Sequence, residues 1–224
     1  MSYNGIPAGV PLVSDEVLEQ IKEIEHVENA SRYLNRQDYN GVYYLNTSLS
    51  GGYVKGIDTN YFDTCNFIMK SGRGFIKSDF AEFRKVAILD EDSAESLFQG
   101  ENPIGKTIEI QQEPYVVIGI VTKMTEFEPV INTIEDYYMY AEQSAGSVYI
   151  PYTTWPILYQ YDEPENVILR IENTDYMTKA GKDCADILNA NLSVMDDSIT
   201  YRAKDLMEQA QQIQELSAST NMML

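Results

Sequence analysis

The sequence predicts an α+β fold, with helices near both ends of the chain and short strands between them. Apolar residues recur at helical spacing over residues 15–24, 178–192 and from residue 206 onward, whereas β-favouring runs fill the interval. Helices and strands do not alternate regularly, so we expect the middle of the chain to be inserted into a domain built from both ends. The 224 residues, 44% of them hydrophobic, can bury the core of one domain or two small ones.

Charge and hydropathy narrow the class of protein. Sixteen Lys and Arg residues against thirty-five Asp and Glu residues give a formal net charge of −19, so we expect no nucleic-acid partner. No stretch reaches the roughly 18 consecutive apolar residues of a membrane-spanning helix. The first nine residues show no secretory signal. We therefore expect either a cytosolic protein or a soluble piece of a longer membrane protein.

The first element is a helix that follows a flexible lead-in rich in Gly and Pro over residues 1–13. Ser14 is the predicted N-cap, and acidic residues follow it at the positive end of the helix dipole. Strands joined by turns then lead to the Gly51-Gly52 pair. One helical stripe faces the core: Val17, Leu18, Ile21 and Ile24.

The middle of the chain predicts a buried strand over 86–89, a short helix over 93–99 that Gly100 ends, and a hairpin with strands 107–111 and 115–121. Residues 124–146 show no clear period and predict a long loop or irregular insert. Beyond it the chain predicts strands over 148–151 and 167–171, a helix over 178–192, a final strand over 198–202 and a terminal helix.

No catalytic or metal-binding arrangement stands out in the sequence. Cys65 and Cys184 are the only cysteines, and the sequence leaves open whether they form a disulfide. His26 is the only histidine, and its place after a helix explains it without catalysis. The acidic runs at 90–92 and 196–197 lack the ligand order of a calcium loop. We expect no enzyme activity, no cofactor and no metal.

One motif suggests an alternative function, that of a phosphate-loop ATPase. Residues 100–107, GENPIGKT, match the phosphate-loop pattern GxxxxGK[ST], and the run VAILDE over 86–91 resembles a magnesium-holding strand. A phosphate loop leaves a strand and opens a helix whose amides bind phosphate. Here a helix precedes the loop and a strand follows it, so the context argues against an ATPase.

The same residues belong to a series of motifs that resembles the MacB-like periplasmic core domain, found outside the membrane in permeases of ABC transporters. GIDTNYF at 56–62 is similar to that family's entry motif, and SGRGF at 71–75 with Ser78 and Asp79 is similar to its next segment. Segments 86–89, 102–108 and 116–120 continue the series in order, and 13–24, 148–151 and 198–202 match more weakly.

The resemblance implies a two-part fold and a function. Residues 1–53 and 153–224 would form a porter-like α/β subdomain, with a mainly β, Sabre-like subdomain inserted over 54–152. The chain would be the extracytoplasmic domain of a cell-membrane permease of an efflux or export system, for instance for antimicrobial peptides or antibiotics. It would relay ATP-driven conformational change to cargo or to an adaptor protein. Implied partners are a cytoplasmic ATPase subunit or domain, a membrane fusion (adaptor) protein, a second permease copy and flanking membrane helices.

Several residues receive expected roles. We expect Gly72, Gly105 and Gly119 to serve backbone geometry, Arg73 and Asp79 to form an ion pair, and Lys106 to be a solvated residue of the hairpin. Four residues of the aromatic and acidic insert are the candidate partner-binding surface, because tyrosine supplies contact area at low entropic cost: Tyr137, Tyr138, Tyr140 and Glu142. The same tyrosines packing onto their own domain, and a free-standing surface binding protein, remain alternatives.

Overall fold

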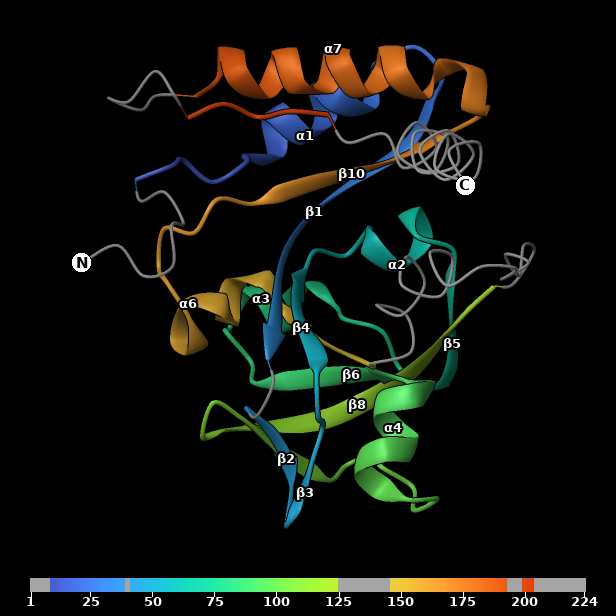
Figure 1. Ribbon diagram of the computed structural model, residues 1–224, viewed down its shortest axis with the longest axis vertical. Helices are drawn as coiled ribbons and strands as arrows, with labels where there is room; N and C mark the ends of the chain where they lie inside the picture. Colours follow the sequence, from blue (N-terminus) through green and yellow to red (C-terminus); the bar gives the residue numbers. More distant parts are fainter. Residues whose placement is uncertain (1–8, 39–40, 125–145, 193–198, 204–224) are drawn as a thin grey trace, which may run out of the picture.

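The computed structural model describes residues 9–38, 41–124, 146–192 and 199–203. It confirms a mixed α+β fold built on one large sheet (Figure 1). The strands are β1 (Val27–Asp38), β2 (Val42–Tyr44), β3 (Thr47–Ser48), β4 (Gly52–Ile57), β5 (Phe67–Gly72), β6 (Val86–Asp90), β7 (Thr107–Ile110), β8 (Glu113–Lys123), β9 (Ser147–Pro151) and β10 (Asn166–Ile171). Their order is β10-β1-β4-β9-β6-β8-β7-β2-β3, with β5 paired to β8.

Short helices connect and cover the strands. They are α1 (Asp15–Lys22), α2 (Tyr61–Thr64), α3 (Lys77–Ala81), α4 (Glu91–Phe98), α6 (Trp155–Leu158) and α7 (Met177–Ala190), with 3-10 turns η1 (Tyr152–Thr154) and η2 (Thr174–Tyr176). The predicted N-cap of α1 is confirmed, because Ser14 Oγ accepts a hydrogen bond of 3.3 Å from the Val17 amide. None of the helices in the described segments combines the length and the apolar composition that a membrane crossing requires.

Two helices from opposite ends of the chain share one small core. Figure 1 shows α1 and α7 together at one end of the molecule, beside β1 and β10. We call this core the α1–α7 cluster; its buried members are Val13, Val17, Leu18, Ile21, Ala30, Cys184 and Leu188. The predicted apolar stripe of the first helix therefore faces a core, as expected.

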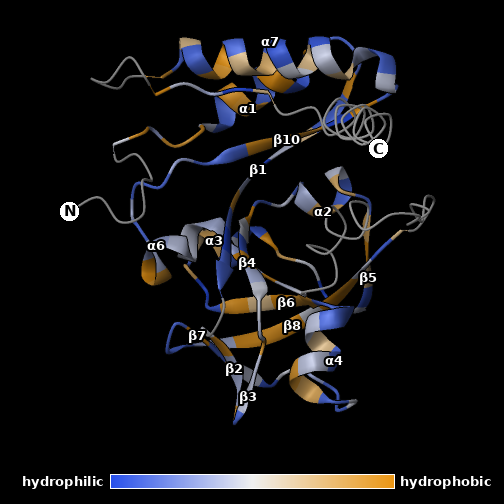
Figure 2. Ribbon diagram, viewed as in Figure 1, coloured by the Kyte–Doolittle hydropathy of each residue, from blue (hydrophilic) through white to orange (hydrophobic). Residues whose placement is uncertain are grey.

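A larger core lies along the rest of the sheet. Figure 2 shows apolar residues concentrated on β6 and β8, and all four residues of 86–89 are buried, which confirms the predicted buried strand. Trp155 and Tyr115 are the largest side chains of this core. A neighbouring aromatic cluster joins Tyr61 and Tyr149 to Phe62 and Phe67. Burial of such large rings supplies much of the stabilising apolar area.

Strand β1 holds the two cores together. Its first half pairs antiparallel with β10, from Val27 to Tyr33, and its second half pairs antiparallel with β4, from Tyr33 to Asp38. Tyr33 thus faces Asn166 on one side and Ile57 on the other. Both ladders run through one continuous strand, so β1 connects β10 directly to β4.

Two expectations from the sequence are wrong. Residues 9–13 are anchored rather than a flexible lead-in, because Val10 and Val13 are only 4% and 5% exposed and the Gly9 amide donates to Asp162, while Leu12 between them is exposed. Residues 199–203 form no strand, because the backbone N–H and C=O of Tyr201 bond to the side chain of Asn189 instead of to a strand. The predicted insert at 125–145, residues 193–198 and the terminal helix from 206 lie outside the described residues.

Substitution of Gly119 tests the close approach of β5 to β8. A Cβ at Gly119 would lie 2.6 Å from the Arg73 carbonyl oxygen, so Gly119→Ala should lower the free energy of unfolding by about 1–3 kcal/mol. In Gly74→Ala the new Cβ would meet nothing closer than 4.0 Å, and we expect a change within about 0.5 kcal/mol. Urea unfolding measures both, and equal losses would contradict the packing described.

Candidate functional site

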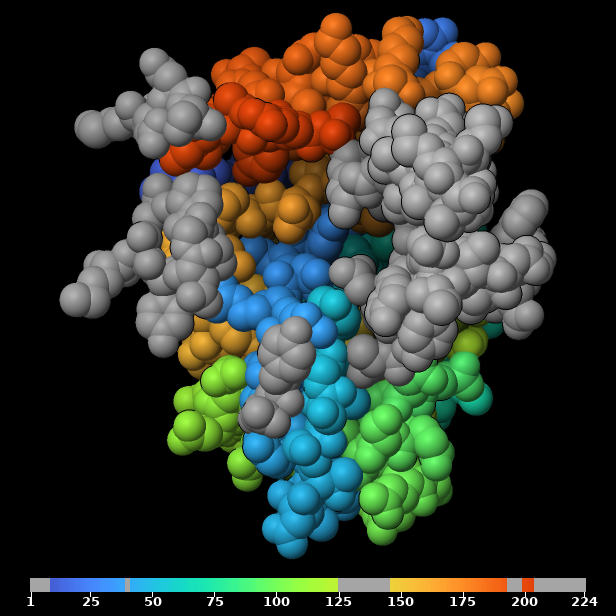
Figure 3. Space-filling model, in the orientation of Figure 1, coloured from blue at the N-terminus to red at the C-terminus, as the bar shows by residue number. Residues whose placement is uncertain are grey.

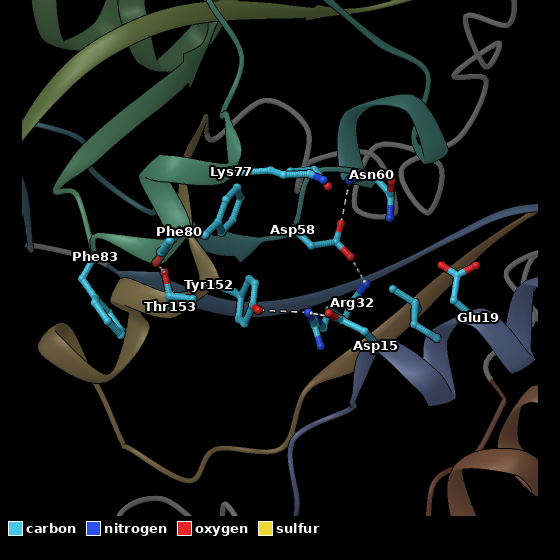
Figure 4. A pocket seen from close by; sticks show the side chains of 13 residues that line it. Asp15, Glu19, Arg32, Asp58, Asn60, Lys77, Phe80, Phe83, Tyr152 and Thr153 are labelled. Atoms are coloured by element: carbon cyan, nitrogen blue, oxygen red, sulfur yellow. Dashed lines mark hydrogen bonds and ion pairs between the residues drawn. The ribbon is translucent and has the colours of Figure 1, made fainter.

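A cleft of about 670 Å³ opens between the helix α1 and strand β1 on one side and α3 and η1 on the other. Figure 4 shows Asp15, Arg32 and Glu19 on one wall and Phe80, Phe83 and Tyr152 on the opposite wall. Asn60 and Lys77 lie at its upper edge in that view. The cleft combines charged and aromatic side chains, and such hollows are where ligands and partner side chains bind.

Arg32 is the central polar residue of the cleft. It is 8% exposed, and its Nη2 donates to Asp15 Oδ1 at 2.6 Å and to Tyr152 Oη at 2.9 Å. Its Nη1 donates to the carbonyl of Val13, and its guanidinium lies 4.4 Å from the centroid of the Tyr152 ring. Stacking and charge-assisted bonds together fix a side chain that is otherwise costly to bury.

Asp58 fixes the crossing of β1 and β4. It follows β4 directly and is 6% exposed. Its Oδ1 accepts bonds from Ser31 Oγ at 2.7 Å and from the Asn60 amide at 2.8 Å, and its Oδ2 accepts the Arg32 amide at 3.2 Å. Three bonds to one carboxylate tie the middle of β1 to the exit of β4.

The aromatic wall comes from α3 and η1. The rings of Phe80 and Tyr152 lie 5.6 Å apart, and Thr153 Oγ1 donates to the Phe80 carbonyl at 3.1 Å. Phe83 follows α3 with a φ of 50° and is 60% exposed. This wall presents apolar surface to solvent directly across from the carboxylates of Asp15 and Glu19 (Figure 4).

The expected Arg73–Asp79 ion pair is present. Arg73 Nη1 and Nη2 lie 2.6 and 3.1 Å from the two carboxylate oxygens of Asp79, which is fully buried, and the Ile76 amide adds a third bond. Burial raises the pKa of Asp79, but the bonds from Arg73 and Ile76 outweigh it and bring that pKa below its ordinary value. The pair closes the turn that enters α3, so its role is structural.

The phosphate-loop motif has the wrong geometry for nucleotide. Helix α4 ends at Phe98 before the motif, and β7 begins at Thr107 at its end, so no helix opens where phosphate would bind. Lys106 forms an ion pair with Glu101, and its amino group lies 5.3 Å from the centroid of the Tyr44 ring. Gly105 has a φ of 82°, which confirms its expected role in backbone geometry.

The cysteines and the histidine offer no reactive centre in the described part of the chain. Cys65 and Cys184 are free thiols in different clusters, and burial raises the pKa of each to about 11. His26 stacks on Tyr176 at 3.5 Å, and its Nδ1 lies 3.0 Å from Glu172. The described residues contain no group of His, Cys, Asp or Glu side chains placed to hold a metal ion.

Comparison with known proteins decides the family. The sequence model of the MacB-like periplasmic core domain matches residues 2–187. The chain belongs to this family. It is therefore an extracytoplasmic domain of an ABC transporter permease.

Relatives of the MacB-like chain are permeases of greater length. It is 25% identical over 218 residues to the Bacillus subtilis ABC transporter permease YvrN, covering 97% of this chain and 51% of YvrN. It is 33% identical over 111 residues to the macrolide export ATP-binding/permease protein MacB of Mannheimia succiniciproducens, covering 50% of this chain and 15% of that protein. The chain thus spans about half the length, or less, of the curated relatives it matches.

Solved structures share the MacB-like fold. The extracellular domain of the transporter YknZ from Gram-positive bacteria matches with a TM-score of 0.59 and 20% identity, covering 85% of this chain and 86% of that one. The periplasmic region of MacB from Actinobacillus actinomycetemcomitans matches with a TM-score of 0.56 and 21% identity, covering 79% and 72%. At these identities the likeness shows the fold alone.

The candidate partner-binding residues of this MacB-like domain, Tyr137, Tyr138, Tyr140 and Glu142, lie outside the described residues, so they stay a prediction. Sequence reasoning missed Arg32, and it quoted Asp58 only as a letter of the motif at 56–62. The run around Arg32, NASRYLN at 29–35, mixes polar and apolar residues, so no pattern in it singles out this side chain.

Replacement of Arg32 tests the polar side of the cleft. Arg32→Met keeps an unbranched stem but removes the guanidinium, which leaves Asp15, Tyr152 and the Val13 carbonyl without their donor, so it should lower the free energy of unfolding by about 2–3 kcal/mol. Lys77→Met on the exposed edge of the same cleft should change it by less than about 0.5 kcal/mol. Thermal or urea unfolding that gives the two variants equal stability would contradict this assignment.

Proposed function

We propose that this domain relays ATP-driven conformational change from the membrane part of a MacB-type permease to cargo or to an adaptor protein, in an efflux or export system. The observation that carries the proposal is the double ladder of β1. This strand joins β10, beside the α1–α7 cluster, to β4, which belongs to the larger core. A domain connected in this way moves as a lever when its ends are displaced.

Both ends of the described chain lie beside the α1–α7 cluster, and this placement supports the proposal. Residues 9–14 lead into α1, and residues 199–203 follow α7, and both segments contact the α1–α7 cluster through Val13 and Tyr201. Figure 3 shows α7 at one end of the molecule and α4 at the opposite end. Motion applied beside the α1–α7 cluster would therefore be amplified at α4.

A second set of contacts, between the sheet and the end of α2, supports the same rigid connection. Arg170 on β10 donates to the Asp63 carbonyl at 3.0 Å and to the side chain of Asn66, both at the end of α2. Asn29 on β1 donates to Asp63 Oδ2 at 2.7 Å. The bonds from Arg170 connect β10 to α2 without passing through the β1 ladder, and the bond from Asn29 connects β1 to the same helix.

The family match supports proposals about partners and cargo. We propose a cytoplasmic ATPase subunit or domain, a membrane fusion (adaptor) protein, a second permease copy and flanking membrane helices as the partners. Export of macrolides is named for the MacB relatives, and for this chain we propose an antibiotic or antimicrobial-peptide cargo. Tyr137, Tyr138, Tyr140 and Glu142 are the proposed adaptor-binding surface. Both a free-standing binding protein and an ATPase account less well for a family match over residues 2–187.

We also propose the division into a porter-like part, 1–53 with 153–224, and an inserted Sabre-like part, 54–152. The separate α1–α7 cluster supports it. Val42 and Leu49 pack in the large core with Ala87 and Ile108, so in this proposal the border on the N-terminal side is better placed between Asp38 and Val42.

Distance measurements in the full-length permease with its ATPase test the lever without knowledge of the cargo. Ser96 is exposed on α4, so Ser96→Cys carrying a spin label, in a background lacking Cys65 and Cys184, reports the separation of the two copies of the dimer. We expect ATP binding to change the separation between the two labels by several ångströms, since α4 lies at the far end of the lever.

The matched control is the pair Ser96→Cys and Lys182→Cys within one copy, with Lys182 exposed on α7. Because a lever moves as one body, this internal distance should stay constant. An unchanged distance between the two copies during ATP hydrolysis would contradict the proposed relay. A change confined to the distance within one copy would contradict movement of the domain as one body.

A further inference from the structure

A buried carboxyl group stands where the segment before α1 meets the start of β10. Glu165 is 1% exposed, and its Oε2 accepts the Val13 amide at 2.7 Å. Its other oxygen, Oε1, is buried and has no hydrogen-bond partner among the described residues. An ionised carboxylate with one oxygen unpaired in the interior is costly, whereas the neutral acid is much less so.

Glu165 and Arg32 hold the backbone of the same residue, Val13, on its two sides. Glu165 binds the N–H of Val13, and Arg32 binds its C=O. Val13 packs in the α1–α7 cluster, and Tyr201 packs against that cluster. The hydroxyl of Tyr201 is also buried without a partner in the described part of the chain. Both ends of the described chain therefore meet beside Glu165.

The groups that face Glu165 come from every surrounding element. They are Arg32 on β1, Asp15 on α1, Asp58 after β4, Tyr152 in η1 and Tyr201. Burial raises the pKa of the Glu165 carboxyl to about 7, against the opposing effects of Arg32 and of the Val13 amide, while Asp58 and Asp15 raise it further. Burial and then the charge of Glu165 raise the pKa of Tyr201 to about 12, so Tyr201 stays neutral.

We propose that Glu165 is a proton-controlled latch: when neutral it keeps residues 9–14 closed over β10 beside Tyr201, and when ionised it favours their release. The direction follows from linkage. In an open arrangement water reaches the carboxyl, whose pKa returns toward 4.5, so the closed arrangement binds the proton more tightly. Closure is therefore strongest below about pH 4.5 and weakens as the pH rises to about 7. The latch is a property of the isolated chain and does not depend on the relay proposed above.

Hydrogen exchange of the Val13 amide in the 224-residue chain tests the latch. After correction for the intrinsic exchange rate, the protection of this amide should fall as the pH rises from 5 to 7, by at most about tenfold per pH unit. Above about pH 7 the profile should flatten, because Glu165 is then ionised in both arrangements.

Glu165→Gln is a permanently neutral side chain of the same shape, and its amide oxygen can still accept the Val13 N–H. We expect its corrected protection to be independent of pH and to match or exceed that of the natural chain at pH 5. The matched control is Glu163→Gln. Glu163 is also buried, but it bonds to Arg36 at 2.7 Å and to Trp155 at 2.9 Å, so the sloping profile should persist.

A flat profile in the natural chain, or a slope that survives in Glu165→Gln, would overturn the latch. If Glu165→Gln does not fold, the carboxyl carbon of Glu165 is titrated by NMR in the natural chain. A midpoint near pH 7, shared by the Val13 amide, supports the proposal. A midpoint below about pH 5 refutes it.

Discussion

The described structure depends on one strand with two sets of partners. Strand β1 bonds to β10 along its first half and to β4 along its second, and the change occurs at Tyr33. Asp58 secures this crossing, because its carboxylate bonds to the side chain of Ser31 and to the amides of Arg32 and Asn60. Without that carboxylate, the amide of Arg32 and the exit of β4 would lose the contact that fixes their relative position. The α1–α7 cluster would then be joined to the larger core by a less constrained strand.

Polar residues share with the apolar Leu34 the face of β1 that meets residues 152–165. Arg36 bonds to Glu163, which also accepts the indole N–H of Trp155, and Asp38 accepts the hydroxyl of Tyr159 at 2.9 Å. Such directional bonds add to the register that the burial of Leu34 on the same face already specifies. The proposed relay would need this fixed register, because a connection that slips does not transmit displacement. The cleft at Arg32 is the solvent-open end of the same face.

The sequence could predict elements whose signals are local. The Ser14 cap, the buried run at 86–89 and the Arg73–Asp79 pair are set by neighbouring residues, and the structure shows each of them. Likewise, the order of helix and strand around residues 100–107 sufficed to set aside the phosphate loop. The predicted strand over 198–202 is wrong because the backbone N–H and C=O of Tyr201 bond to the side chain of Asn189 on α7. No pattern in residues 198–202 reveals that competition. Glu165 was missed for a related reason. Its role depends on Val13, 152 residues away, and spacing along the chain carries no information about such a contact.

The central claim is that β1 makes the α1–α7 cluster and the larger core one mechanical unit. Native-state hydrogen exchange in rising urea measures this directly, because it resolves parts of a protein that open separately. The account predicts that the amides of β10 and those of β9 exchange through one opening, with equal free energies and equal dependence on urea. If the amides of β10 instead open at a clearly lower free energy and with a smaller urea dependence, the two cores unfold independently, and a relay through β1 is contradicted.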